Sequence, residues 1–414
     1  MTQMSWSSSA MPGRLQHGAA NWMENGFRQC WILGVALLVL NIGRLSGAFN
    51  SNPMEKGIFL IALLLFCLKN PVNKPALSFL GLASLPVFVF GAFTTYPDFS
   101  WLRLIMAYVA LLSVAGFYVI TPSRRDSELI LKSIAILPVV LLLYGALLFL
   151  AFGIPLMMRD HTGATRLAGA AIPAFLAAAS YAASVAAAYL FCHTRQTRYF
   201  LLCLIALVVC ALSGSRTPTV VALASAGAVL FIRFSGVQRI ALVVFGGAGL
   251  LLFLATAGDQ LVMRFMASSS SGRDMIWGIV ESWTARFPHT GIGFGHSGAV
   301  IPYYVSRITG TEATHNEYLR LSLELGYWGC AVFLVAFLGM CMAAVRRFSW
   351  EALLLFALFF LYAYTDNVFF LTYALMGPLA CIQGLRLLQD EGADAKDDLR
   401  QGDAPSSRPD RGRT

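Results

Sequence analysis

Residues 129–153 read LILKSIAILPVVLLLYGALLFLAFG, an apolar run in which Lys132 is the sole charged residue. About 20 predominantly apolar residues are enough for a helix to cross the hydrocarbon core of a bilayer. Similar runs recur from one end of the chain to the other, for example at residues 101–120 and 167–191. The repetition predicts an all-α polytopic membrane protein.

The composition agrees with this fold class. Of the 414 residues, 57% are hydrophobic and 12% are charged, and the net charge is +9. Soluble domains carry about 25% charged and about 45–50% apolar residues. These values exclude a soluble enzyme with one anchor, a disulfide scaffold and a nucleic-acid-binding protein. Basic cytoplasmic loops account for the positive charge without a polyanionic partner.

Apolar stretches bounded by charged or turn residues give about twelve candidate spans, with ends good to about three residues. They cover residues 29–48, 57–68, 76–94, 101–120, 129–153, 167–191, 199–213, 218–232, 240–257, 326–345, 350–365 and 368–388. This organisation comprises an N-terminal segment (1–28), nine spans (29–257), a long loop with short helices (258–325), three spans (326–388) and a disordered tail (389–414).

The positions of Lys and Arg in the short loops predict the orientation, because cytoplasmic loops carry an excess of both. One set of alternate loops holds Lys69, Lys74, Arg124, Arg125, Arg195, Arg198, Arg233, Arg239, Arg346 and Arg347. The other set holds only Lys56, Arg159 and Arg216. Both termini are therefore predicted to be cytoplasmic, and the loop at residues 258–325 lies on the outer face. A loop of this length is a candidate for function.

The first chemical motif is SGSRTP at residues 213–218, where one predicted span ends and the next begins. Pro218 suits the first turn of a helix, and Ser215 or Thr217 suits its N-cap. Free backbone N–H groups, the helix dipole and the Arg216 charge would then meet at the membrane edge, where they favour a phosphate or diphosphate. A capped hairpin whose Arg extends to water is an equally good interpretation.

The second motif is SGRDMIW at residues 271–277. Ser271 and Asp274 resemble a capping box, which places Arg273 in the first turn of a helix. An apolar stripe follows at helical spacing and is closed by a proline: Ile276, Val280, Trp283, Phe287 and Pro288. The stripe predicts packing, at the membrane interface or over the bundle.

The third motif is TEATHNEYL at residues 311–319, in which Thr314 and Glu317 form a full capping box. His315 would lie in the first turn of this helix, where the dipole disfavours imidazolium and keeps the ring neutral, as a general base requires. A histidine at a helix start is more often structural than catalytic. Two anion-binding helix starts on the same face give the catalytic interpretation more weight.

Other features are weaker. GIGFG at residues 291–295 is predicted to be a closely packed turn, because no parallel strand precedes it. Arg159, His161 and Arg166, near the outer end of the sixth span, could help to hold an anion. Outer loops contain no Asp-x-Asp or Glu-x-Asp pair and the cysteines show no ligand spacing, so no metal or cofactor is expected.

These motifs resemble those of the O-antigen ligase and polymerase superfamily of bacterial envelope glycosyltransferases. The resemblance covers about residues 200–330 and includes FPHTGIGFG at 287–295 and ELG at 324–326. It implies a helical bundle of the GT-C class in the bacterial inner membrane, which transfers a glycan from undecaprenyl diphosphate to an acceptor hydroxyl on the periplasmic face. In ligases the acceptor is lipid A–core oligosaccharide, and in polymerases it is a second lipid-linked repeat.

The resemblance also suggests roles for residues. Arg216 and Arg273 would neutralise the diphosphate leaving group without a metal or nucleotide, and His315 would deprotonate the acceptor in one inverting displacement. Secondary candidates for binding the substrates are Ser215, Arg166, Arg159, His161 and Asn316. Arg166 belongs to a segment in which Ile172-Pro173 replaces the family's usual Asn-Pro.

One dominant outer loop and a length near 400 residues favour a ligase over a polymerase. A flippase or transporter is the main alternative outside the enzymes, and it predicts ionisable residues within the spans or inverted repeats. The spans are almost free of charge and show no internal repeat.

Overall fold

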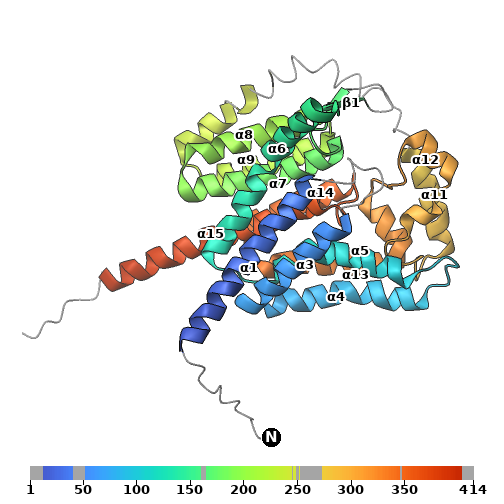
Figure 1. Cartoon of the computed structure of the whole chain (residues 1–414), viewed down its shortest axis with the longest axis horizontal. Coiled ribbons are helices and arrows are strands. Elements are labelled where there is room, and N and C mark those ends of the chain that lie inside the picture. Colours follow the sequence, from blue (N-terminus) through green and yellow to red (C-terminus); the bar gives the residue numbers. More distant parts are fainter. Residues whose placement is uncertain are drawn as a thin grey trace, which may run out of the picture.

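The computed structural model describes residues 13–40, 52–159, 165–244, 246–248, 251, 273–345 and 347–402. Within these ranges the chain is mostly helical, with one short β-hairpin (Figure 1). The elements are α1 (Gly13–Leu40), α3 (Asn52–Lys69), α4 (Lys74–Phe93), α5 (Trp101–Ala115), η1 (Gly116–Val119), α6 (Arg124–Phe152), β1 (Met157–Arg159), β2 (Thr165–Leu167), α7 (Pro173–Thr194), α8 (Thr197–Leu212), α9 (Arg216–Arg233), α11 (Arg273–Arg286), η2 (Ser297–Val300), α12 (Tyr303–Thr309), α13 (Glu317–Ala344), α14 (Trp350–Ala363) and α15 (Thr372–Gly402).

Polar residues at the helix starts explain where several apolar helices begin. The side-chain oxygen of Asn73 accepts a hydrogen bond from the backbone N–H of Ala76 at the start of α4. Ser100, Ser123 and Ser349 cap α5, α6 and α14 in the same way. Each cap satisfies a backbone donor that has no partner within its helix, and it therefore fixes the first turn.

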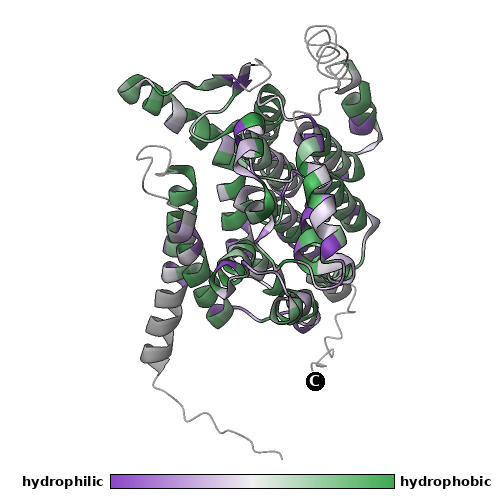
Figure 2. Cartoon of the chain, turned by 90° about the vertical axis from the view of Figure 1, so that its right-hand side faces the viewer, coloured by the Kyte–Doolittle hydropathy of each residue, from purple (hydrophilic) through white to green (hydrophobic). Residues whose placement is uncertain are grey.

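Within the described ranges, five helices are long and apolar enough to cross a membrane by length and composition: α4, α5 with η1, α6, α7 and α13. Large apolar side chains point away from the bundle, including Leu64 (61% exposed), Leu143 (63%), Leu150 (79%) and Val335 (68%). Figure 2 shows hydrophobic residues over most of the helix surfaces, including the outside of the bundle. Hydrocarbon tolerates such a surface and water does not, so the chain is a helical membrane protein.

Every predicted span overlaps a helix wherever it falls on described residues, although half of residues 240–257 and all of 41–48 lie outside them. Residues 167–172 were predicted to open the sixth span, and they instead form the end of β2 and a turn before Pro173. The antiparallel pair β1–β2 is a small exception to an all-α fold.

The segment predicted as a disordered tail from residue 389 continues α15 as far as Gly402. Residues 389–402 are rich in Ala, Glu, Asp, Lys, Arg and Gln, and several of these have high helix propensity. At the N-terminal end of the chain, residues 1–28 were predicted to be a cytoplasmic extension. They contain the first turns of α1, which begins at Gly13. Helix propensity thus extends both helices beyond their apolar runs.

The directions of helices α9 and α14 distinguish the two ends of the bundle. They pack together, and Arg233 at the end of α9 pairs with Glu351 in the first turn of α14 at 2.6 Å, so they run antiparallel. The start of α9, at Arg216, therefore lies toward the same end as Asp366, which follows α14. His315 follows α12 and contacts Asp366, which brings the α11–α12 region to this end too.

The end of the bundle that holds Arg216, His315 and Asp366 is called the loop end below. The start of α1 and the end of α15 lie on the opposite side of the molecule (Figure 1).

The loop at residues 287–296 packs tightly on α13, as the glycine pattern predicted. Gly291 has φ 65°, and a Cβ there would lie 2.4 Å from the carbonyl of Glu324. The backbone N–H groups of Ile292 and Gly293 donate to the carbonyls of Leu323 and Glu324 at 3.0 and 2.9 Å. The turn therefore docks the loop on α13 through the backbone itself.

The predicted apolar stripe of α11 is a packing surface. Ile276 and Val280 are fully buried in a small satellite core, with Trp283 and Phe287 packed against it. Tyr96, in the α4–α5 connection, meets the rings of Trp283 and Phe287 edge-on. This core fixes α11 over the loop end, with Arg273 at its first position as predicted.

Candidate active site

His315 and Asp366 form the centre of a polar cluster at the loop end. His315 Nδ1 lies 3.3 Å from Asp366 Oδ1, and the two side chains are 23% and 17% exposed. The hydroxyl of Tyr362 donates to Asp366 Oδ2 at 3.4 Å, and the backbone N–H of Asn367 donates to Oδ1 at 2.9 Å. When Nδ1 carries the proton it donates to Asp366, and Nε2, which lies 3.5 Å from the Thr311 hydroxyl, keeps a lone pair that can accept a proton.

The predicted helix start at Thr314 is wrong by two residues. Asn316 is the N-cap of α13, and its Oδ1 accepts the backbone N–H groups of Tyr318 and Leu319 at 3.0 and 3.1 Å. Asn caps a helix as well as Thr does, and here it lies next to the first helical residue, Glu317. His315 therefore precedes the helix, with φ 48°, and its ring is placed by Asp366.

Arg273 joins the same cluster from α11. Burial lowers the pKa of its guanidinium from the ordinary value, and the nearby Asp366 carboxylate opposes that shift. A guanidinium remains charged at any physiological pH, so the site keeps a positive charge beside the carboxylate. Arg273 and His315, two residues that the sequence motifs indicated independently, thus both lie near Asp366, which they did not indicate.

A second group forms around the SGSRTP motif. Arg166 on β2 donates from Nε to the carbonyl of Ser213 and from Nη2 to Ser215 Oγ, both at 2.8 Å. Ser215 occupies the N-cap position of α9 as predicted, but its side chain makes no capping hydrogen bond. Arg216 is the first residue of α9 and is exposed, and Pro218 lies in the first turn. The β1–β2 pair thus places Arg166 against Ser213 and Ser215, next to Arg216 in the chain.

The remaining candidates are placed less centrally. Arg159 lies on β1, exposed, and opposite Thr165 in the strand register. His161 lies outside the described residues. Asn316 acts on backbone donors as the N-cap, so its side chain is already engaged. The structure therefore yields two groups at the loop end: Arg166 with Ser215 and Arg216, and Arg273 with His315 and Asp366.

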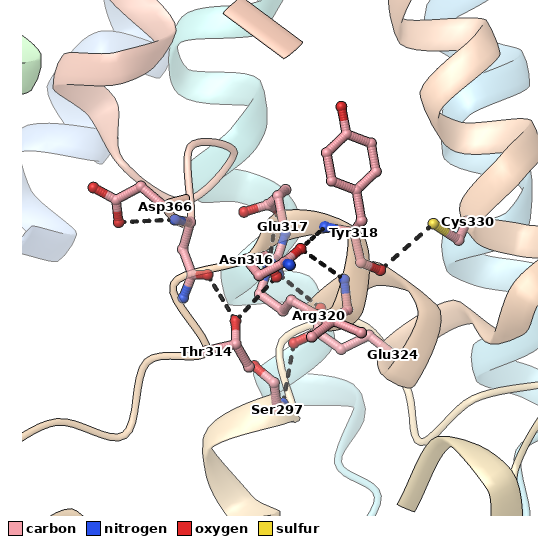
Figure 3. A network of polar contacts seen from close by, with 11 residues as sticks. Ser297, Thr314, Asn316, Glu317, Tyr318, Arg320, Glu324, Cys330 and Asp366 are labelled. Carbon is pink, nitrogen blue, oxygen red and sulfur yellow. Dashed lines mark hydrogen bonds and ion pairs between the residues drawn. The ribbon is translucent and has the colours of Figure 1, made fainter. Parts of the chain in front are cut away.

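Sequence reasoning also missed a buried ionic cluster in the first turns of α13 (Figure 3). Arg320 is fully buried, and it donates to Glu317 at 2.8 Å and to Glu324 at 2.7 Å. Glu324 accepts the backbone N–H of Ser297 at 3.0 Å, and the guanidinium lies 3.7 Å from the ring centroid of Phe370. The spacing of Glu317, Arg320 and Glu324, which places them on one helix face, was the available signal. The cluster ties the start of α13 to η2 and to the turn before α15.

For Asp366 the available signal was its position. It is a carboxylate in the short connection between two apolar helices, on the face predicted to be outer. Nothing local to residue 366 indicates that its partner is residue 315.

Among the described residues, no group of three or more His, Cys, Asp or Glu side chains is placed to hold a metal ion. The motifs imply glycan transfer, and we expect it not to depend on a divalent cation, because the arginines would supply the positive charge that Mg²⁺ or Mn²⁺ provides elsewhere. The measurement is the initial rate with and without a strong chelator. A rate lost on chelation and restored by an added divalent cation would contradict this expectation.

A comparison with models of known protein families bears on the resemblance that these motifs indicated. A model described as O-antigen ligase matches residues 201–334. The matched segment includes Ser215, Arg216, Arg273 and His315, whereas Arg166 and Asp366 lie outside it. The match confirms the resemblance to the O-antigen ligase superfamily that the sequence motifs indicated. No curated protein and no solved structure matches the chain.

Proposed function

We propose that this protein is a membrane glycosyltransferase of the O-antigen ligase or polymerase type, which transfers a glycan from undecaprenyl diphosphate to an acceptor hydroxyl. The observation that carries the proposal is the His315–Asp366 pair near Arg273, because His315 and Arg273 both lie within the segment that matches the ligase family. This arrangement offers a base, an orienting carboxylate and a cation for the leaving group within one cluster.

In the proposed reaction His315 Nε2 takes the proton of the acceptor hydroxyl. The acceptor oxygen forms a bond to the anomeric carbon of the donor as the bond from that carbon to the diphosphate oxygen breaks. Asp366 holds the ring by Nδ1 and stabilises the imidazolium that forms, in the manner of the carboxylate in a Ser-His-Asp triad. The electron pair leaves with the diphosphate, and the anomeric carbon is inverted.

The arginines would bind the leaving group. Planar guanidinium groups make bidentate, charge-assisted hydrogen bonds to phosphate, and such contacts strengthen as negative charge develops. Arg273 is near enough to Asp366 to interact with it electrostatically. Arg216 lies at the start of α9, toward the loop end, and Arg166 contacts the neighbouring Ser215. A diphosphate would then be held between the two groups of residues.

The finer assignment is a ligase that uses lipid A–core as acceptor, in a bacterial inner membrane, with about twelve spans in a GT-C-like arrangement. Both termini would be cytoplasmic and the site periplasmic. Support comes from basic residues opposite the loop end, where Lys69 pairs with Asp126 at 2.7 Å and Arg233 pairs with Glu351. Basic residues concentrate on the cytoplasmic side of membrane proteins.

The test uses the full-length chain in proteoliposomes with undecaprenyl diphosphate-linked glycan and lipid A–core, and His315→Ala as the inactive control. We expect glycan on lipid A–core together with free undecaprenyl diphosphate. Longer lipid-linked glycan without that product would identify a polymerase. Translocation of the lipid-linked glycan without either product would contradict an enzyme and favour a flippase.

A further inference from the structure

His315 has an unusual backbone conformation. It is one of two non-glycine residues with positive φ in the described part of the chain, the other being Arg195 at the end of α7. At φ 48° the backbone lies in the left-handed region, which costs free energy for a residue with a side chain. Such a conformation persists only where the surrounding contacts hold it.

The residue before His315 is held from two directions. The indole Nε1 of Trp277 donates to the carbonyl oxygen of Thr314 at 2.7 Å, and Thr314 Oγ1 donates to Asn367 Oδ1 at 2.7 Å. Thr314 is 1% exposed, so its own atoms in both bonds are shielded from bulk water. The residue after His315 is Asn316, which is fixed as the N-cap of α13. Both neighbours of the strained residue are therefore anchored.

The same contacts connect His315 to its carboxylate. Asn367 accepts the Thr314 hydroxyl through its side chain and donates its backbone N–H to Asp366 Oδ1. Trp277 lies one turn after Arg273 on α11, so one helix supplies both the guanidinium beside Asp366 and the indole that holds Thr314. The position of α11 thus sets the relative geometry of base, carboxylate and cation.

We propose that Trp277, Thr314 and Asn367 are positioning residues that hold the His315 imidazole against Asp366 with Nε2 directed at the acceptor hydroxyl. None of the three touches the reacting atoms. The inference rests on the proposed function for its reaction, but the claim that the Trp277 N–H fixes the His315 ring is independent of it. The key atom is the indole hydrogen, because the ring alone cannot hold the carbonyl of residue 314.

The kinetic test compares two identical changes on α11. Trp277→Phe removes the donor and keeps an aromatic ring. The control is Trp283→Phe, because Trp283 stacks on Phe287 and its indole donates no hydrogen bond within the described residues. We expect Trp277→Phe to lower kcat roughly 10²-fold, the effect of misplacing a catalytic group by about 1 Å, with KM for the donor unchanged. Trp283→Phe should keep a kcat close to that of wild type.

The second readout is the ¹⁵N NMR signal of the His315 imidazole, identified by its loss in His315→Gln, and it needs no transfer activity. We expect the Nδ1 signal to move in Trp277→Phe and to stay in Trp283→Phe. Movement without any transfer by the wild type would reject the proposed function and keep the positioning role. An unmoved signal, or equal kcat in both Phe variants, would overturn the positioning role.

A second pair of variants covers the case in which Trp277→Phe does not accumulate. Thr314→Val removes the hydroxyl that donates to Asn367 and keeps the shape, whereas Thr314→Ser keeps the donor. We expect kcat and the His315 signal to change in the Val variant and to be restored in the Ser variant. Equal behaviour of the two would overturn the role of the Thr314–Asn367 bond.

Discussion

His315→Gln is expected to lower kcat of glycan transfer by about 10²–10⁴, the contribution of a general base. Glutamine keeps a side chain that can hydrogen bond to Asp366 and to the acceptor, but it cannot take up a proton. The measurement is kcat of glycan transfer for both proteins under the same conditions.

The matched control is His289→Gln, since His289 lies in the same loop region with an exposed side chain. It should keep the kcat of wild type. A His315→Gln variant within about tenfold of wild type would change the role of His315 from base to positioning of the acceptor.

Asp366→Asn should resemble His315→Gln in rate, because an amide cannot stabilise the imidazolium.

The sequence predicted the helices well because hydrophobicity over about 20 residues dominates local detail in a membrane protein. It failed where small apolar residues serve a different purpose. Ala168, Gly169 and Ala170 continue the apolar run of the sixth span, yet they form a turn packed against α6. A Cβ on Gly145 would lie 2.5 Å from the backbone of Gly169, and this close approach fixes the turn before α7. Hydropathy contains no information about such a contact.

The site was predictable residue by residue but not in its pairing. Thr314 and Asn316 are both good N-caps, and local sequence cannot decide between them once Thr314 is engaged by Asn367. Asp366 could be identified as a polar residue in a turn predicted to be outer. Its contact with His315 depends on the start of α13 and the end of α14 coming together, and that arrangement is tertiary. Motifs therefore identified the arginines and the histidine, and the structure supplied the carboxylate.

The last prediction concerns the two arginines. Arg216→Ala and Arg273→Ala are each expected to lower kcat by about 10²–10³ while the protein still inserts and accumulates. The reason is the loss of one charge-assisted contact to a leaving group that gains charge in the transition state. Lysine should rescue poorly at both positions, because it has no planar pair of donors. The poorer rescue is expected at Arg273, where burial and Asp366 constrain the group more than at the exposed Arg216.

Arg286→Ala is the matched control for these arginines, because Arg286 lies on α11 with Arg273 and contacts the ring of Trp283, 4.8 Å from its centroid, instead of the polar cluster. It should transfer glycan at a rate close to that of wild type.

A further prediction concerns Arg216 and Arg273 together. Because both would hold one diphosphate, the fold-loss of kcat in the double Ala variant should be smaller than the product of the two single fold-losses. Strictly multiplicative losses would mean that Arg216 and Arg273 act on separate groups, and near-normal rates in both single variants would remove the proposed diphosphate site.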